Sequence, residues 1–78
     1  MDIRDTRETI LEIQKFLLDI SYRNSGFPRI TMDGIYGKET EDAVRYFQGL
    51  YGLPVTGIVD YFTLFMLYDI YKEQKENE

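Results

Sequence analysis

The sequence predicts a small all-α fold in which three helices are joined by two irregular loops of similar shape. Residues 33–44 and residues 56–67 nearly repeat each other, and each stretch reads as a turn followed by a helix. Gly34 matches Gly57, and the offset of 23 residues is constant along both stretches. A repeat of this length is typical of one supersecondary unit used twice, each copy needing its neighbour to complete a core. Apolar residues at helical spacing support the same fold class.

The composition indicates one globular domain, predicted to span residues 1–78 with a core over about 5–73. The hydrophobic fraction is 44%, and seven tyrosines with five phenylalanines supply ample apolar surface for one core. Cysteine and histidine are both absent. Their absence excludes a disulfide framework, the common zinc sites and a Cys–His nucleophile pair, so we expect no metal and no cofactor.

The charge and the hydrophobic pattern exclude two classes of partner. A net charge of −5 gives no basic footprint for nucleic acid. No apolar run approaches the roughly 20 residues that span a bilayer, so membrane insertion is not expected. Residues 1–5 lack the basic segment and apolar stretch of a secretory signal, which makes a cytoplasmic location compatible with this chain.

The first helix is predicted over residues about 5–22, with Asp5 placed to cap it. One face carries apolar residues at helical spacing, namely Ile10, Ile13, Leu17 and Ile20. Turn-forming residues follow over 23–37, and we expect Ile30 and Met32 to anchor this loop to the core.

The second helix is predicted over residues about 38–51, with Gly37 as its cap and Gly52 ending it. Gly49 lies inside this helix, where glycine is unfavourable by roughly 1 kcal/mol relative to alanine, so we expect a close packing contact to require it. The buried face is expected to consist of Thr40, Ala43, Val44, Phe47, Leu50 and Tyr51.

The third helix is predicted over residues about 61–73, after Asp60 as its N-cap. Its buried face is expected to carry Leu64, Leu67, Tyr68 and Tyr71, widened by Phe65 and Met66. The polar tail over residues 73–78 is expected to fray in solvent.

A long motif runs through the second helix and the loops on either side of it. Residues 33–57 read DGIYGKETEDAVRYFQGLYGLPVTG, and residues 63–67 read TLFML. This resembles the three-helix type of peptidoglycan-binding domain, whose pattern is DG-x-F/Y-G-x-x-T-x-x-AV-x-x-FQ-x-x-x-GL, a second TG, and T-x-x-x-L. Gln14 stands where the family has the Gln of a Leu-Gln pair, so the resemblance covers roughly residues 10–70. The residues assigned to the structural motif are Asp33, Gly34, Gly37, Thr40, Ala43, Val44, Phe47, Gln48, Gly52, Gly57, Asp60, Thr63 and Leu67.

The resemblance implies a closed orthogonal three-helix bundle and non-catalytic attachment to bacterial peptidoglycan, usually beside a tethered cell-wall hydrolase. It implies a cell-wall or extracellular location if the chain is part of a larger secreted protein. Two departures from the family are visible in the sequence. Ser21–Met32 is longer than the usual loop, and Leu64 stands where many members carry tryptophan.

Most motif residues are interpreted as structural. The four motif glycines are expected to meet backbone needs, and the two motif threonines to bond back to the loops. The binding candidates are Tyr36, Tyr46 and Tyr61, whose rings would stack on sugars, and Lys38 and Arg45, which would assist. The two loop–helix junctions are expected to form a notch that seats a peptide carboxylate on free backbone N–H groups.

Alternatives remain at this point. The ligand could be glycan or stem peptide. A protein-interaction or structural module on the same fold is the rival hypothesis, because fold does not fix function. Catalysis by a pair of carboxylates is not expected, since a bundle of this size has little room for a cleft with a protected acid.

Overall fold

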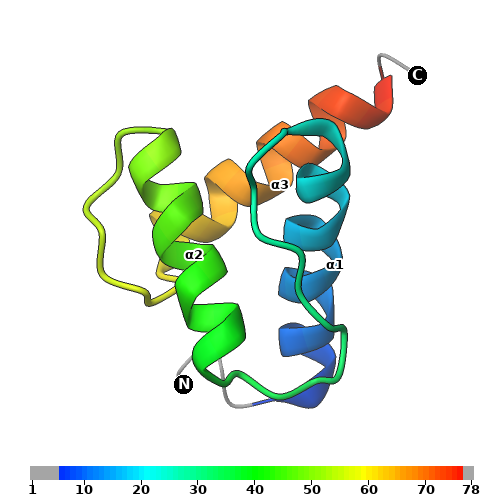
Figure 1. The fold of residues 1–78 in the computed structure, drawn as a ribbon, viewed down its shortest axis with the longest axis vertical. Helices are drawn as coiled ribbons and strands as arrows, with labels where there is room; N and C mark the ends of the chain where they lie inside the picture. The colour runs from blue at the N-terminus through cyan, green and yellow to red at the C-terminus, as the bar shows by residue number, and fades with distance from the viewer. Residues whose placement is uncertain (1–5, 77–78) are drawn as a thin grey trace.

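The computed structural model describes residues 6–76, which form three helices, α1 (Arg7–Arg23), α2 (Lys38–Leu50) and α3 (Tyr61–Glu76). α1 and α2 run in the same direction, and α3 crosses them diagonally (Figure 1). The all-α, three-helix prediction is therefore confirmed. That the two loop–helix units have the same shape stays a prediction. None of the helices within residues 6–76 is long and apolar enough to cross a membrane.

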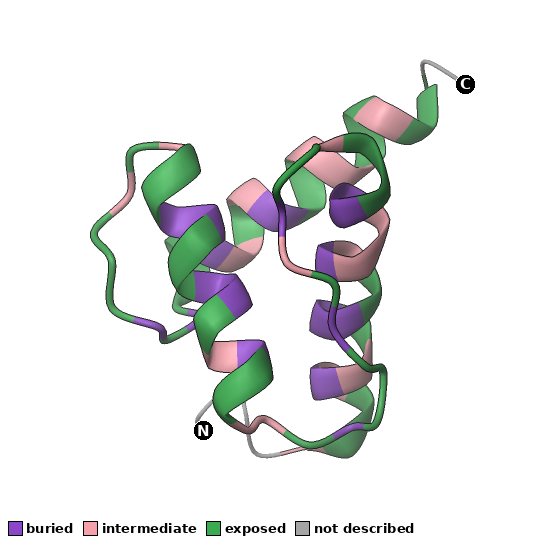
Figure 2. Ribbon diagram, in the orientation of Figure 1, coloured by how far each residue is buried: buried purple, intermediate pink, exposed green. Residues whose placement is uncertain are grey.

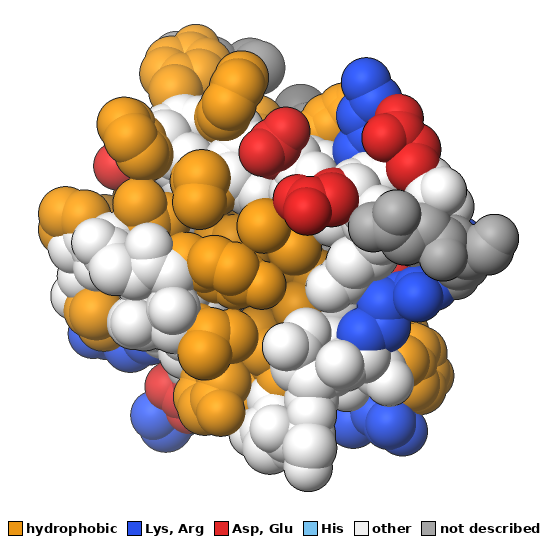
Figure 3. Space-filling model, turned by 90° about the horizontal axis from the view of Figure 1, so that it is seen from above, with side chains coloured by type: hydrophobic (Ala, Val, Ile, Leu, Met, Phe, Trp, Pro, Cys, Tyr) orange, Lys and Arg blue, Asp and Glu red, His pale blue; other side chains and the backbone are white. Residues whose placement is uncertain are grey.

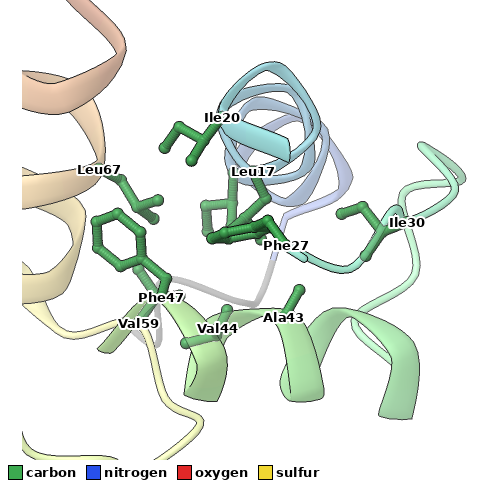
Figure 4. Packing of buried hydrophobic residues seen from close by; sticks show 10 residues of the cluster. Leu17, Ile20, Phe27, Ile30, Ala43, Val44, Phe47, Val59 and Leu67 are labelled. Atoms are coloured by element: carbon green, nitrogen blue, oxygen red, sulfur yellow. The ribbon is translucent and has the colours of Figure 1, made fainter. Parts of the chain in front are cut away.

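One hydrophobic core joins the three helices and both loops. Leu17 of α1, Phe47 of α2 and Leu67 of α3 are fully buried, and their side chains point toward one another (Figure 4). The buried residues of α1 and α2 lie on the sides that face each other (Figure 2). The core cluster is Ile13, Leu17, Ile20, Phe27, Ile30, Ala43, Val44, Phe47, Val59 and Leu67.

The start of α1 differs from the prediction. Thr6 is the N-cap, and its Oγ1 accepts a hydrogen bond from the backbone N–H of Thr9 at 3.2 Å. This bond satisfies one of the N–H groups that the first helical turn leaves without a partner. The predicted cap, Asp5, lies outside the described residues. The predicted apolar face of α1 is confirmed, because all four of its residues are buried.

The loop between α1 and α2 is anchored by a residue that periodicity did not reveal. Phe27 is 5% exposed and packs in the core together with Ile30. Met32, the other predicted anchor, is 43% exposed, so that part of the prediction is wrong. Val59 has the same role in the second loop. Neither Phe27 nor Val59 belongs to a periodic segment, so only tertiary packing identifies them.

α2 agrees with the prediction at its start and differs in its last turn. Four predicted residues are buried, but Leu50 is 50% exposed and Tyr51 is half-buried. The polar Gln48 takes the buried position there instead, with 1% exposure. A Cβ atom at Gly49 would lie 3.8 Å from Val55, an ordinary contact, so packing does not require glycine there.

α3 is three residues longer than predicted, and part of its predicted buried face is confirmed. Leu67 is buried, and Leu64 and Met66 are half-buried against the core. Phe65 is 71% exposed and Tyr68 is 49% exposed, so the prediction is wrong for these two residues, and Thr63 is buried in addition. Phe65 lies two residues from each buried position, which on a helix places it on the far side. The helix continues to Glu76, so the predicted fraying is wrong for residues 73–76, and residues 77–78 lie outside the described part of the chain.

The glycines of the two repeated turns have the backbone conformation that favours glycine. Gly34 and Gly57 have φ angles of 75° and 77°, a region that side chains disfavour. A Cβ atom at either position would also lie under 3.0 Å from an arginine side chain. Gly52 also has positive φ. Gly37 does not: its φ is −102°, and the prediction of a special backbone need there is wrong.

Candidate functional site

The junction between the first loop and α2 is filled by the side chain of Gln14. This α1 residue has 0% exposure, and its Oε1 accepts the backbone N–H of Gly34 at 2.9 Å. Its Nε2 lies 3.0 Å from three acceptors: Asp33 Oδ1, the carbonyl of Ile35 and Thr40 Oγ1. One glutamine from α1 thus fixes the turn and the entry of α2 together.

Gln48 of α2 fills the second junction in the same manner. Its Oε1 accepts the backbone N–H groups of Thr56 and Gly57, both at 2.9 Å. Its Nε2 lies 3.0 Å from the carbonyl of Ile58 and 3.1 Å from Thr63 Oγ1. Thr40 Oγ1 donates to the Ile35 carbonyl at 3.4 Å, as predicted for a bond back to the loop, whereas Thr63 Oγ1 accepts a bond from Gln48 of α2.

These two networks change the expectation of an open notch. The N–H groups of Gly34, Thr56 and Gly57 are already bonded to the protein's own glutamines. The N–H of Thr63, in the first turn of α3, is bonded to Asp60 Oδ1 at 2.8 Å, which confirms Asp60 as an N-cap. A ligand carboxylate would have to displace these bonds, so the loop amides offer no ready anion site.

The carboxylates of both junctions are held in their charged form. The pKa of Asp33 is lowered because it accepts hydrogen bonds from the Ile35 backbone and from Gln14. The pKa of Asp60 is lowered because the backbone N–H and the side chain of Thr63 donate to it. A general acid needs the opposite shift. Within residues 6–76, no group of three or more acidic residues could hold a metal ion.

Two of the predicted binding residues meet at Gly57. The hydroxyl of Tyr36 donates to the Gly57 carbonyl at 2.7 Å. Arg45 lies over the same glycine and pairs with Glu41 on its own helix at 3.0 Å. Tyr36 thus joins the first loop to the second, and Arg45 covers the second loop from α2.

The other three predicted binding residues lie apart from Gly57. Lys38 pairs with Asp42 on α2 at 3.3 Å. Tyr46 meets the ring of Phe27 edge-on, with ring centroids 5.1 Å apart. Tyr61 is 86% exposed at the start of α3 and lines a groove. The structure therefore does not gather the five candidates into one site.

A hollow lies between α1 and α3, and we call it the aromatic groove. This aromatic groove has a volume of about 720 Å³. Glu12, Asp69 and Lys72 contribute charged groups to it. Its apolar lining is Phe16, Tyr61, Leu64, Phe65 and Tyr68.

Helical spacing explains the groove. Tyr61, Phe65, Tyr68 and Lys72 follow one another at four, three and four residues, so they form one stripe along α3. Phe16 of α1 stacks on Tyr68, with ring centroids 6.1 Å apart and an angle of 15° between the rings. The sequence alone gives the spacing of this stripe on α3, but it does not show that α1 lies beside the stripe.

A second hollow, of about 500 Å³, continues from the aromatic groove and shares Glu12, Phe16, Tyr68 and Lys72 with it. Lys15, Tyr71, Lys75 and Glu76 complete its lining. The Nζ atoms of Lys15 and Lys75 each lie 5.7 Å from the centre of the Tyr71 ring. We call this part the lysine end of the groove.

Comparisons with known proteins agree with the motif and the fold. A family model described as "Putative peptidoglycan binding domain" matches residues 6–67. The chain is 43% identical over 47 residues to the N-acetylmuramoyl-L-alanine amidase CwlA of Bacillus subtilis (strain 168). That alignment covers 59% of this chain but only 17% of the amidase. No solved structure matches. Because the family model spans most of the chain, the chain belongs to the peptidoglycan-binding domain family.

Proposed function

We propose that this domain binds peptidoglycan, without catalysing a reaction, through the aromatic groove between α1 and α3. The observation that carries the proposal is the stripe of Tyr61, Phe65 and Tyr68, whose rings are 86%, 71% and 49% exposed beside Phe16. Exposed aromatic rings in a line suit the apolar C–H faces of successive sugar rings. The phenol groups, Glu12 and Asp69 supply hydrogen-bonding partners for sugar hydroxyls.

The size of the groove suits a short stretch of polymer. Its volume of about 720 Å³ lies in the range of roughly 300–1,000 Å³ common for ligand sites. It is an open hollow between two helices, so binding by one domain is expected to be weak after the entropic cost of association.

Weak binding is sufficient for a tethering role, because attachment raises the local concentration of a linked partner. The matched relative is an amidase by name, and the chain aligns with only a small part of it. We propose that the domain anchors a wall-processing enzyme to peptidoglycan in the cell wall.

Retention on purified bacterial sacculi tests the site. Phe65→Ala and Tyr61→Ala are expected to reduce retention about 5-fold each, since one aromatic contact contributes roughly 1 kcal/mol. The matched control is Phe62→Ala: this residue is on the same helix and 68% exposed, but lines neither hollow. Circular dichroism and thermal unfolding check that each variant folds. Equal retention of all three variants and the wild type would exclude this groove as the binding site.

A protein-interaction module is the second candidate, and the extent of exposed hydrophobic surface favours it. Hydrophobic side chains gather across one face of the molecule, with acidic groups at its margin (Figure 3). Large exposed patches of this kind often mark interfaces. Light scattering that shows a defined complex, together with no retention on sacculi, would support this function instead.

A further inference from the structure

We propose that the lysine end of the groove binds a carboxylate of the peptidoglycan stem peptide while the aromatic part holds the glycan. This inference rests on the proposed function, because it assigns the two ends of one groove to two parts of one ligand. The two hollows share four lining residues, so a ligand lying on Tyr68 reaches both.

Three ammonium groups converge at the lysine end from two helices. Lys15 comes from α1, and Lys72 and Lys75 come from α3. Cations near the end of α3 are favoured by the helix dipole, which accounts for the two α3 lysines. The dipole of α3 does not account for Lys15. The ring of Tyr71 lies within cation–π range of both Lys15 and Lys75, so these two ammonium groups share one aromatic partner.

These lysines are available to a ligand. Among residues 6–76, no ion pair involves Lys15, Lys72 or Lys75, although Asp19 and Glu76 stand four residues from two of them. By contrast, Lys38 and Arg45, the two cations that the sequence predicts to assist binding, are both paired with carboxylates of α2. Lys15, Lys72 and Lys75 therefore carry positive charge that no carboxylate among residues 6–76 pairs with.

The local charge is unusual for this protein. The chain has a net charge of −5, yet three lysines face two glutamates, Glu12 and Glu76, at the lysine end. A net positive site can attract a carboxylate, and the two glutamates can accept hydrogen bonds from peptide N–H groups. A stem peptide carries both groups, and it is covalently linked to a sugar that would lie on the neighbouring aromatic rings.

The test compares two ligands by chemical-shift titration: a disaccharide with its stem peptide and the same disaccharide without the peptide. The wild type is expected to bind the peptide-bearing ligand about 5-fold to 10-fold more tightly, the range expected for three partly solvated charge contacts. Replacing Lys15 and Lys75, which line only the lysine end, by glutamine is expected to remove most of this preference and to leave binding of the peptide-free disaccharide unchanged.

Arg29→Gln is the matched control, because Arg29 is an exposed cation that stacks on Tyr22 and lines neither hollow. This variant should keep the preference. If the wild type binds both ligands equally, the carboxylate assignment is overturned and the glycan site stands. If neither ligand shifts any groove resonance, the proposed function fails too. If a glycerol-phosphate polymer displaces the muropeptide at lower concentration than free stem peptide does, the anion is a phosphate and the assignment is overturned.

Discussion

Gln48→Glu tests whether the buried glutamines hold the loops by donating hydrogen bonds as well as accepting them. The change keeps the shape and the accepting oxygen that the N–H groups of Thr56 and Gly57 use. It removes the donor that faces Ile58 and Thr63. Threonine hydroxyls can rotate and donate to the new carboxylate, but the Ile58 carbonyl cannot. A charged oxygen would therefore face a carbonyl oxygen at about the present 3.0 Å separation.

The expected loss at pH 7 is about 2–4 kcal/mol. One net hydrogen bond accounts for roughly 1 kcal/mol, and burying a charge next to an unpaired carbonyl adds roughly 1–3 kcal/mol. For a domain of this size, each kcal/mol lowers Tm by about 4–8 °C, so the expected drop is at least about 10 °C. Total stability at this length is on the order of 5–10 kcal/mol, so the variant should still fold.

The dependence on pH gives the sharper test. The protonated carboxyl can donate one hydrogen bond again, so its pKa in the folded state is raised above the unfolded value of about 4.3. A group of this kind stabilises fully below its unfolded pKa and loses that contribution as pH rises through its folded pKa. The gap in Tm between wild type and Gln48→Glu should therefore be small near pH 4 and wide at pH 7.

Thermal unfolding followed by circular dichroism from pH 4 to 8 measures this gap. The pKa values of Asp33 and Asp60 are both lowered from 3.8, so both carboxylates are already charged over most of this range. Ser25→Asp adds the same charge at an exposed position of the first loop, outside both networks, and should show no such widening. A gap that stays constant with pH, or no gap at pH 7, would refute the assigned hydrogen bonds.

Two further predictions concern the second loop. Gly57→Ala should lower stability by more than about 2 kcal/mol in urea unfolding, because positive φ adds to a clash 2.9 Å from Arg45 Nε. Gly52→Ala, at similar φ but with nothing within 4 Å, should lose only about 1–2 kcal/mol, and an equal loss would contradict the contact. Asp60→Asn keeps the cap oxygen for Thr63, so stability at pH 7 should change little. Because the pKa of Asp60 is depressed from 3.8, its charge stabilises above that pH, and unfolding curves below pH 4 should show a smaller acid-induced loss for the variant than for the wild type.

The sequence predicted α1 and α2 well because each has one apolar face. In α1, the spacing of Ile10, Ile13, Leu17 and Ile20 identified the buried side without ambiguity. The same reasoning identified the buried face of α3 only in part. Apolar residues occur all around this helix, and periodicity cannot choose between several apolar faces. The buried side of α3 is identified by a tertiary contact, because Gln48 of α2 donates a hydrogen bond to Thr63 on that side.

The candidate site was less predictable than the fold. Tyr36 was selected because it lies near a helix start, but its hydroxyl is bonded to a loop 21 residues away. Tyr61 was selected by the same reasoning and does line the groove. Its partner ring, Phe16, lies on α1, and no local pattern links these two positions. The lysine end depends on the same pairing of α1 with α3.

Different residues determine the stability of the domain and its proposed ligand binding: the two buried glutamines the first, and the aromatic stripe the second. Gln14 and Gln48 satisfy the loop amides from inside, so the loops stay rigid without a ligand. Thr63 and Leu67 are the buried residues of α3, whereas Phe65 on the opposite side is exposed, and exposed apolar surface of this kind often marks a binding site. Changes at Gln48 should therefore lower the stability of the domain and leave the affinity of its folded form unchanged, whereas changes at Phe65 should lower affinity in a domain that melts like the wild type.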